Sequence, residues 1–170
     1  MTTINPYSNT GNASTTGGAP IVGSERRRSD GPGPEVMDAD TLIGDTVVNS
    51  SGEDLGKIEA IMLDVTSGRI AYAVLSFGGF LGMGSKYFAI PWPAFTLDTD
   101  EKRFILDVSK DRLENAPGFD KDHWPSMADP TWATELHSYY NVTPYWDDGY
   151  ADTVRDPRST QDEVASPRTY

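Results

Sequence analysis

The sequence predicts a mainly β protein, built on a small six-stranded β-barrel with a short helical, aromatic-rich extension after it. Six short segments between residues 45 and 108 are rich in β-branched and aromatic side chains, and turn-forming residues separate them. One segment, residues 69–77, is apolar on both faces, which indicates packing on both sides. A closed barrel is favoured over a sandwich because a sheet this small would otherwise leave two open edges.

The predicted strands follow one another with turn chemistry between them. Residues 46–49 form the first strand, and residues 55–65 form the second, which alternates polar and apolar side chains at its start. The sequence Thr66-Ser67-Gly68 then turns the chain into the strand at 69–77. The remaining strands are expected at residues 87–92, 95–98 and 104–108.

The two-faced strand at 69–77 predicts a surface that needs a cover. In a narrow barrel the small residues on one face, Ala71 and Ala73, fit the inside, which leaves Ile70, Tyr72 and Val74 on the outside. The cover is either the chain's own aromatic extension or a second copy of the protein. We therefore predict Ile70, Tyr72 and Val74 as partner-binding residues.

The glycine-rich stretch at residues 78–86 predicts a connecting loop rather than a phosphate-binding loop. The lysine and the serine stand in the reverse of the Walker order, and a strand rather than a helix follows. The loop displays three apolar residues that are either a contact surface or a cover over an open barrel end: Phe80, Leu81 and Met83.

An extension at residues 118–150 is expected to pack on the barrel or on a partner, because residues 117–150 contain eight aromatic side chains. Ser109 is a good N-cap for a short helix at 109–115. Asp129, followed by proline at the first helical position, predicts a longer helix over 130–140. Its apolar stripe supplies two further candidate partner contacts, Trp132 and Tyr139.

Both ends of the chain, residues 1–37 and 151–170, are predicted to be disordered, and the tail is acidic. Of the first 35 residues, 22 are Gly, Pro, Ser, Thr or Asn, and five are larger apolar residues. Burying five such side chains contributes ~15 kcal/mol at most. Ordering the backbone of that head costs at least ~35 kcal/mol.

Composition argues against several classes of function. The net charge of −12 disfavours nucleic acid and anionic membrane as partners. The absence of cysteine removes disulfides, thiolate nucleophiles and Cys-ligated metals. Apolar runs are far shorter than the roughly 20 residues that cross a bilayer, so we expect a cytoplasmic protein without membrane insertion. No triad or metal-ligand spacing occurs around His123 and His137, so no catalytic residue, metal or cofactor is expected.

An ordered set of short motifs resembles the PRC-barrel domain, the family named for the photosynthetic reaction-centre H subunit. The resemblance spans about residues 40–117 and implies a domain at 38–117 with a six-stranded barrel fold. The chain has only a polar head where the reaction-centre subunit has a membrane helix, and that head is too short for the second domain of the ribosome maturation factor. The motifs are Leu42-Ile43-Gly44, Val47, Gly52, Leu55-Gly56-Lys57-Ile58, Asp64, Gly68-Arg69-Ile70, Gly78-Gly79-Phe80 and Ile90-Pro91-Trp92.

These observations predict a non-enzymatic protein that docks a protein partner or associates with a second copy of itself as a homodimer. The alternative is a small-molecule or ion-binding barrel that uses the loop from Phe80 to Met83 as a lid. By family analogy alone, the resemblance also suggests an accessory role in photosynthetic electron transport or ribosome maturation.

Overall fold

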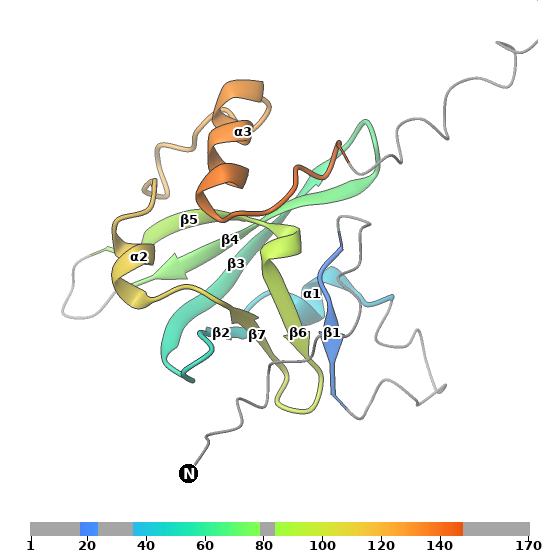
Figure 1. Ribbon diagram of the computed structural model, residues 1–170, viewed down its shortest axis with the longest axis vertical. Coiled ribbons are helices and arrows are strands. Elements are labelled where there is room, and N and C mark those ends of the chain that lie inside the picture. The colour runs from blue at the N-terminus through green and yellow to red at the C-terminus, as the bar shows by residue number, and fades with distance from the viewer. Residues whose placement is uncertain (1–17, 24–35, 79–83, 148–170) are drawn as a thin grey trace, which may run out of the picture.

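The computed structural model describes residues 18–23, 36–78 and 84–147. Within these ranges seven strands form one mixed sheet, in the order β1-β6-β7-β2-β3-β4-β5 (Figure 1). The strands are β1 (Ile21–Val22), β2 (Thr46–Val48), β3 (Asp54–Asp64), β4 (Arg69–Phe77), β5 (Lys86–Pro91), β6 (Phe95–Asp98) and β7 (Arg103–Leu106). The helical elements are α1 (Ala39–Leu42), the 3-10 helix η3 (Trp92–Ala94), α2 (Lys110–Glu114) and α3 (Pro130–Tyr139).

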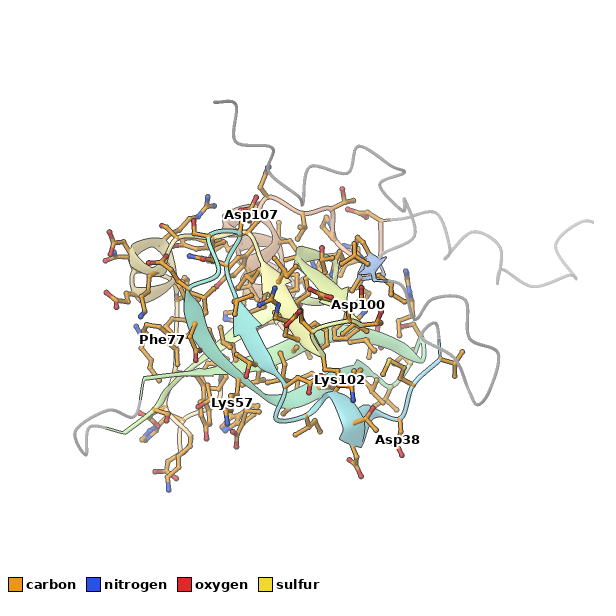
Figure 2. The ribbon with its side chains drawn as sticks, turned by 90° about the horizontal axis from the view of Figure 1, so that it is seen from below. Asp38, Lys57, Phe77, Asp100, Lys102 and Asp107 are labelled. Atoms are coloured by element: carbon orange, nitrogen blue, oxygen red, sulfur yellow. The ribbon has the colours of Figure 1, made fainter. Side chains whose placement is uncertain are left out.

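The sheet curls around one apolar core. Phe88 of β5 and Phe95 of β6 belong to the same buried cluster, although their strands lie near opposite ends of the strand order. The Phe95 and Phe104 rings lie 5.5 Å apart, and the Trp92 ring of η3 lies 5.7 Å from Phe104. Because side chains from strands near both ends of the order share one cluster, the sheet is strongly curved. Charged side chains such as Asp38, Lys57 and Asp107 are exposed at the periphery (Figure 2).

The predicted mainly β, barrel-like fold is confirmed, but the strand pairing of the described residues gives an open order and no continuous closed barrel. In the part of the chain that the structure describes, the two end strands β1 and β5 do not pair with each other. Strand β5 ends at Pro91, and the chain leaves the sheet through η3, which has a second proline at its centre. Proline has no N–H to continue a strand ladder. Trp92, predicted as the last residue of a strand, is therefore half-buried in η3.

The six predicted strands are all present, with ends that differ by one or two residues. Strand β4 has five consecutive buried residues, which confirms that both of its faces are packed. The neighbouring strand β3 approaches β4 closely at Gly56, where φ is +126°. A Cβ at Gly56 would lie 2.1 Å from the carbonyl oxygen of Ser76, so only glycine fits there.

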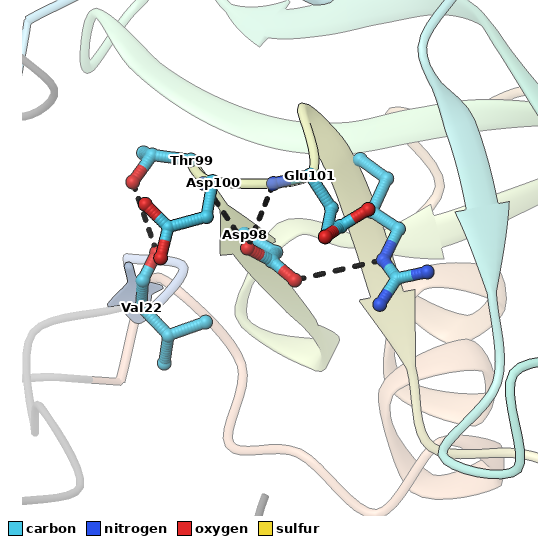
Figure 3. A network of polar contacts seen from close by, with 6 residues as sticks. Val22, Asp98, Thr99, Asp100 and Glu101 are labelled. Carbon is cyan, nitrogen blue, oxygen red and sulfur yellow. Dashed lines mark hydrogen bonds and ion pairs between the residues drawn. The ribbon is translucent and has the colours of Figure 1, made fainter. Parts of the chain in front are cut away.

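The seventh strand, β1, comes from the head that we predicted to be disordered. The backbone N–H of Thr99 and its Oγ1 donate to the carbonyl oxygen of Val22, at 2.9 and 3.1 Å (Figure 3). The turn behind it is held by Asp98, which is buried, accepts two backbone N–H bonds and pairs with Arg103 at 3.5 Å. Disorder was therefore wrongly predicted for the segment around Ile21, because hydrogen bonds to the backbone of β6 and of the turn after it order this segment. Of the predicted head, the structure describes residues 18–23, 36 and 37. The rest of the head and the tail 151–170 lie outside the described residues.

Candidate interaction surface

The outer face of β4 is covered by the chain's own extension, which was one of the two predicted covers. Helix α3 lies over β4 and β5 (Figure 1) and buries Ala133 and Leu136. Its first turn is capped by the carboxylate of Asp129, as predicted. The Tyr72 ring on β4 packs edge-on against Trp132, with centroids 5.4 Å apart. The aromatic residues of the extension therefore pack within the chain.

This packing corrects the assignment of Tyr72 and Val74 as partner-binding residues. Tyr72 is 1% exposed and Val74 is 0% exposed, so a partner cannot reach either side chain while the extension is in place. Burial raises the pKa of the Tyr72 hydroxyl well above its ordinary value, and nearby Tyr145 and Asp64 add to the shift. Ile70, at the start of β4, is only half-buried.

The other predicted contacts have different outcomes. Trp132 and Tyr139 are half-buried. The Tyr139 hydroxyl donates to the carbonyl oxygen of Arg112 at 2.6 Å, and the Arg112 guanidinium lies 5.2 Å from the Tyr139 ring centroid. Tyr139 therefore connects α3 to α2 through its contacts with Arg112. Phe80, Leu81 and Met83 lie outside the described residues.

A buried histidine lies at the centre of the extension. His137 is 1% exposed, and its Nδ1 lies 2.7 Å from the carbonyl oxygen of Ala133. Because a carbonyl only accepts, Nδ1 carries the proton, and Nε2 has no hydrogen-bond partner among the described residues. Burial lowers the pKa of His137, against the opposing effects of the Ala133 hydrogen bond and of Asp147. The imidazole is therefore held in its neutral form, with Trp146 packed edge-on at 5.0 Å.

The segment after α3 is attached to the hairpin formed by β3 and β4. The Arg69 guanidinium lies 5.9 Å from the Tyr145 ring centroid and donates to the Tyr145 carbonyl oxygen. Burial, together with the nearby Asp64 carboxylate, raises the pKa of the Tyr145 hydroxyl. These contacts hold Tyr145 against the edge of Tyr72, with ring centroids 6.3 Å apart.

An apolar surface remains open where the extension ends. Leu63 is 60% exposed and Val65 is 89% exposed, at the end of the β3–β4 hairpin. Next to them is a hollow of about 450 Å³ whose walls include Met62, Met127 and Tyr145. We call Met62, Leu63, Val65, Met127 and Tyr145 together the hairpin surface.

A bulge in β4 lies beside this surface. Met62 pairs with Tyr72 and the next residue, Leu63, pairs with Ile70, two positions away on β4. Ala71 is therefore the extra residue on β4, and the ladder is irregular at the point where Met62 is half-buried and Leu63 is exposed. Beyond the extension, Leu63 and Val65 remain as exposed apolar side chains.

Sequence reasoning placed Leu63 and Val65 in a strand but did not identify them as a surface. Alternation puts Leu63 and Val65 on one face of a strand, but the sequence does not show that the extension leaves this face uncovered. The one available signal is a pair of large apolar side chains next to a polar turn, since residues at a hairpin end are normally solvated.

The described residues contain neither a metal-binding group nor a membrane-spanning helix. In residues 18–23, 36–78 and 84–147, no group of three or more ligand-type side chains is placed to hold a metal ion. Over the same part of the chain, no helix combines the length and the apolar character needed to cross a bilayer.

Comparison with known proteins places part of the chain in a family. Residues 34–113 match the family model of the PRC-barrel domain. The matched region includes every strand from β2 to β7 and most of α2, and it ends before α3. A search of curated proteins finds no match for this chain.

Proposed function

Because residues 34–113 are a PRC-barrel domain, we propose that this chain is a non-enzymatic protein-interaction module that docks another protein through its hairpin surface. The observation that carries this proposal is the exposure of Leu63 and Val65 beside a hollow whose walls are partly apolar and partly polar. Large apolar side chains that are exposed together on a folded domain are typical of contact sites. The sequence offers binding residues rather than a catalytic constellation.

The occupant that fits this surface is an apolar segment of a protein that is neutral or basic. The hollow of about 450 Å³ is large enough for one or two apolar side chains. Two copies of this chain, each with a net charge of −12, would repel each other in direct face-to-face contact. A second copy is therefore the less favourable occupant of the hairpin surface.

A photoreactive amino acid at position 65 tests the proposal in living cells. The matched control places the same amino acid at Lys57, an exposed position on the same strand. We expect one identified protein to be crosslinked from position 65 and not from position 57. That protein, once purified, should bind the unmodified chain and lose binding to the Val65→Asp variant.

Two results would contradict the docking proposal. The first is the same set of crosslinked proteins from positions 65 and 57, which would indicate random collision. The second is full binding of the purified protein to a correctly folded Val65→Asp variant. A crosslink to a second copy alone would replace docking by self-association.

Binding of a small ligand is a second candidate function, supported by a second hollow. It has a volume of about 720 Å³ and opens beside Gly78, where the glycine-rich loop begins, between β3, the end of β4 and α2. Lys57 and Lys110 lie in its walls together with several carboxylates. A thermal-shift screen of small anions and cations tests this candidate, because a bound ligand raises the melting temperature. No shift with any compound would argue against it.

A further inference from the structure

Strand β1 is an addition to the PRC-barrel domain. The family match begins at residue 34, whereas β1 is formed by Ile21–Val22. If β1 were removed, β6 would be the outermost strand on that side of the sheet. An outermost strand presents unpaired N–H and C=O groups, which accept a further strand. The domain therefore has an edge that a short segment from outside the domain fills.

The segment is held by backbone hydrogen bonds and by packing of Ala19 and Ile21 against the core. The N–H of Leu97 donates to the carbonyl oxygen of Pro20 at 2.8 Å, and Thr99 donates to Val22 (Figure 3). The side chains of Ile21 and Val22 are only half-buried. Each such hydrogen bond contributes about 1 kcal/mol net. The segment can therefore leave and rebind without unfolding the domain.

The edge of β6 is nevertheless selective for what binds it. Gly23 leaves the strand with φ at +124°, and a Cβ at this position would lie 2.2 Å from Oγ1 of Thr99. Only glycine combines this backbone angle with this close approach. The site therefore accepts a short extended segment followed by glycine, and this chain carries one at residues 21–23.

We propose that the β6 edge is a strand-acceptor site that residues 20–23 of a second copy fill in place of the chain's own segment. The inference rests on the proposed interaction function and extends it to self-association at a separate surface. Twelve residues, 24–35, connect Gly23 to Val36, and at about 3.3 Å per residue they reach about 40 Å. That length allows the segment to bind a neighbouring copy.

Charge and symmetry favour this exchange as the way in which two copies associate. The segment from Pro20 to Gly23 carries no charge, and the connecting residues allow the two acidic domains to stay apart. Reciprocal exchange uses the same contact twice, which gives a closed dimer with twofold symmetry. Because binding within one chain competes, the dimer should increase with protein concentration.

Disulfide trapping tests the exchange. The sequence contains no cysteine, so only the introduced cysteines can form a disulfide. Ile21 and Leu97 are register partners, so one chain carries Ile21→Cys and a differently tagged chain carries Leu97→Cys. On mixing under mild oxidation we expect a disulfide between the two chains, with a yield that rises with concentration. The control pairs Ile21→Cys with Ile43→Cys, since Ile43 is exposed and lies off the β6 edge.

The outcomes separate this inference from the proposed docking function. A yield no higher than that of the Ile43→Cys control would overturn strand exchange. A chain with both Ile21→Cys and Leu97→Cys should form the bond internally when dilute, and its failure to do so would also overturn the inference. Adding Gly23→Val should abolish the bond between chains. Adding Val65→Asp should leave that bond intact, even though it removes docking at the hairpin surface.

Discussion

Replacing Leu136 by alanine tests how firmly the extension is held on the sheet. Leu136 is 2% exposed on α3 and belongs to the main apolar core. Each buried methylene contributes about 0.8 kcal/mol, so removing the three outer carbons costs about 2.4 kcal/mol. The cavity that remains raises the expected loss to about 3 kcal/mol. Because small domains are stabilised by only about 5–15 kcal/mol in total, this loss is readily measured.

The assay is chemical denaturation followed by intrinsic fluorescence, together with hydrogen exchange of residues 130–145. We expect Leu136→Ala to lower the unfolding free energy and to speed exchange throughout α3. Glu135→Ala is the matched control, because Glu135 is the exposed neighbour on the same helix. A loss below about 1 kcal/mol with unchanged exchange would refute the packing of α3 on the sheet.

Three further predictions concern single side chains. Asn49→Ala leaves two backbone N–H groups of the following turn without their acceptor, so denaturation should show a loss of about 2 kcal/mol, and an unchanged midpoint would contradict this. Gly56→Ala should destabilise far more than Gly52→Ala, because only the first would clash with Ser76, and equal losses would argue against the close approach. His137 has a lowered pKa in the folded chain, so the unfolded chain binds the proton first and stability should fall as pH drops below about 6.5. Denaturation of His137→Phe over the same pH range should show a shallower fall, and an identical slope would exclude His137 as the cause.

Much of the fold was predictable because its signals are local. The strand at 69–77 alternates between two apolar faces, and β4 is buried on both. The N-cap at Asp129 and the proline after it located α3 to within one residue. These features depend on neighbouring residues in the sequence, so the sequence alone contains them.

The features that were missed depend on partners distant in the sequence. Strand β1 is ordered by backbone groups of β6, more than 70 residues away, as the bond between Thr99 and Val22 shows. The order of the strands likewise depends on distant pairing, since β1 and β5 lie at opposite ends of the sheet and alternation within one strand does not indicate this. The candidate site includes Leu63 and not the predicted Tyr72, because the extension buries Tyr72 and leaves Leu63 exposed. Only the folded chain shows where the extension stops covering the sheet.

Hydroxyl-radical footprinting of the full chain, alone and with the protein crosslinked from position 65, tests the account most directly. In the free chain we expect rapid oxidation of Leu63 and Val65 and strong protection of Tyr72, which α3 covers. Addition of the partner should protect Leu63 and Val65 and leave Tyr72 unchanged. Rapid oxidation of Tyr72 in the free chain, with protection only after the partner binds, would contradict the account.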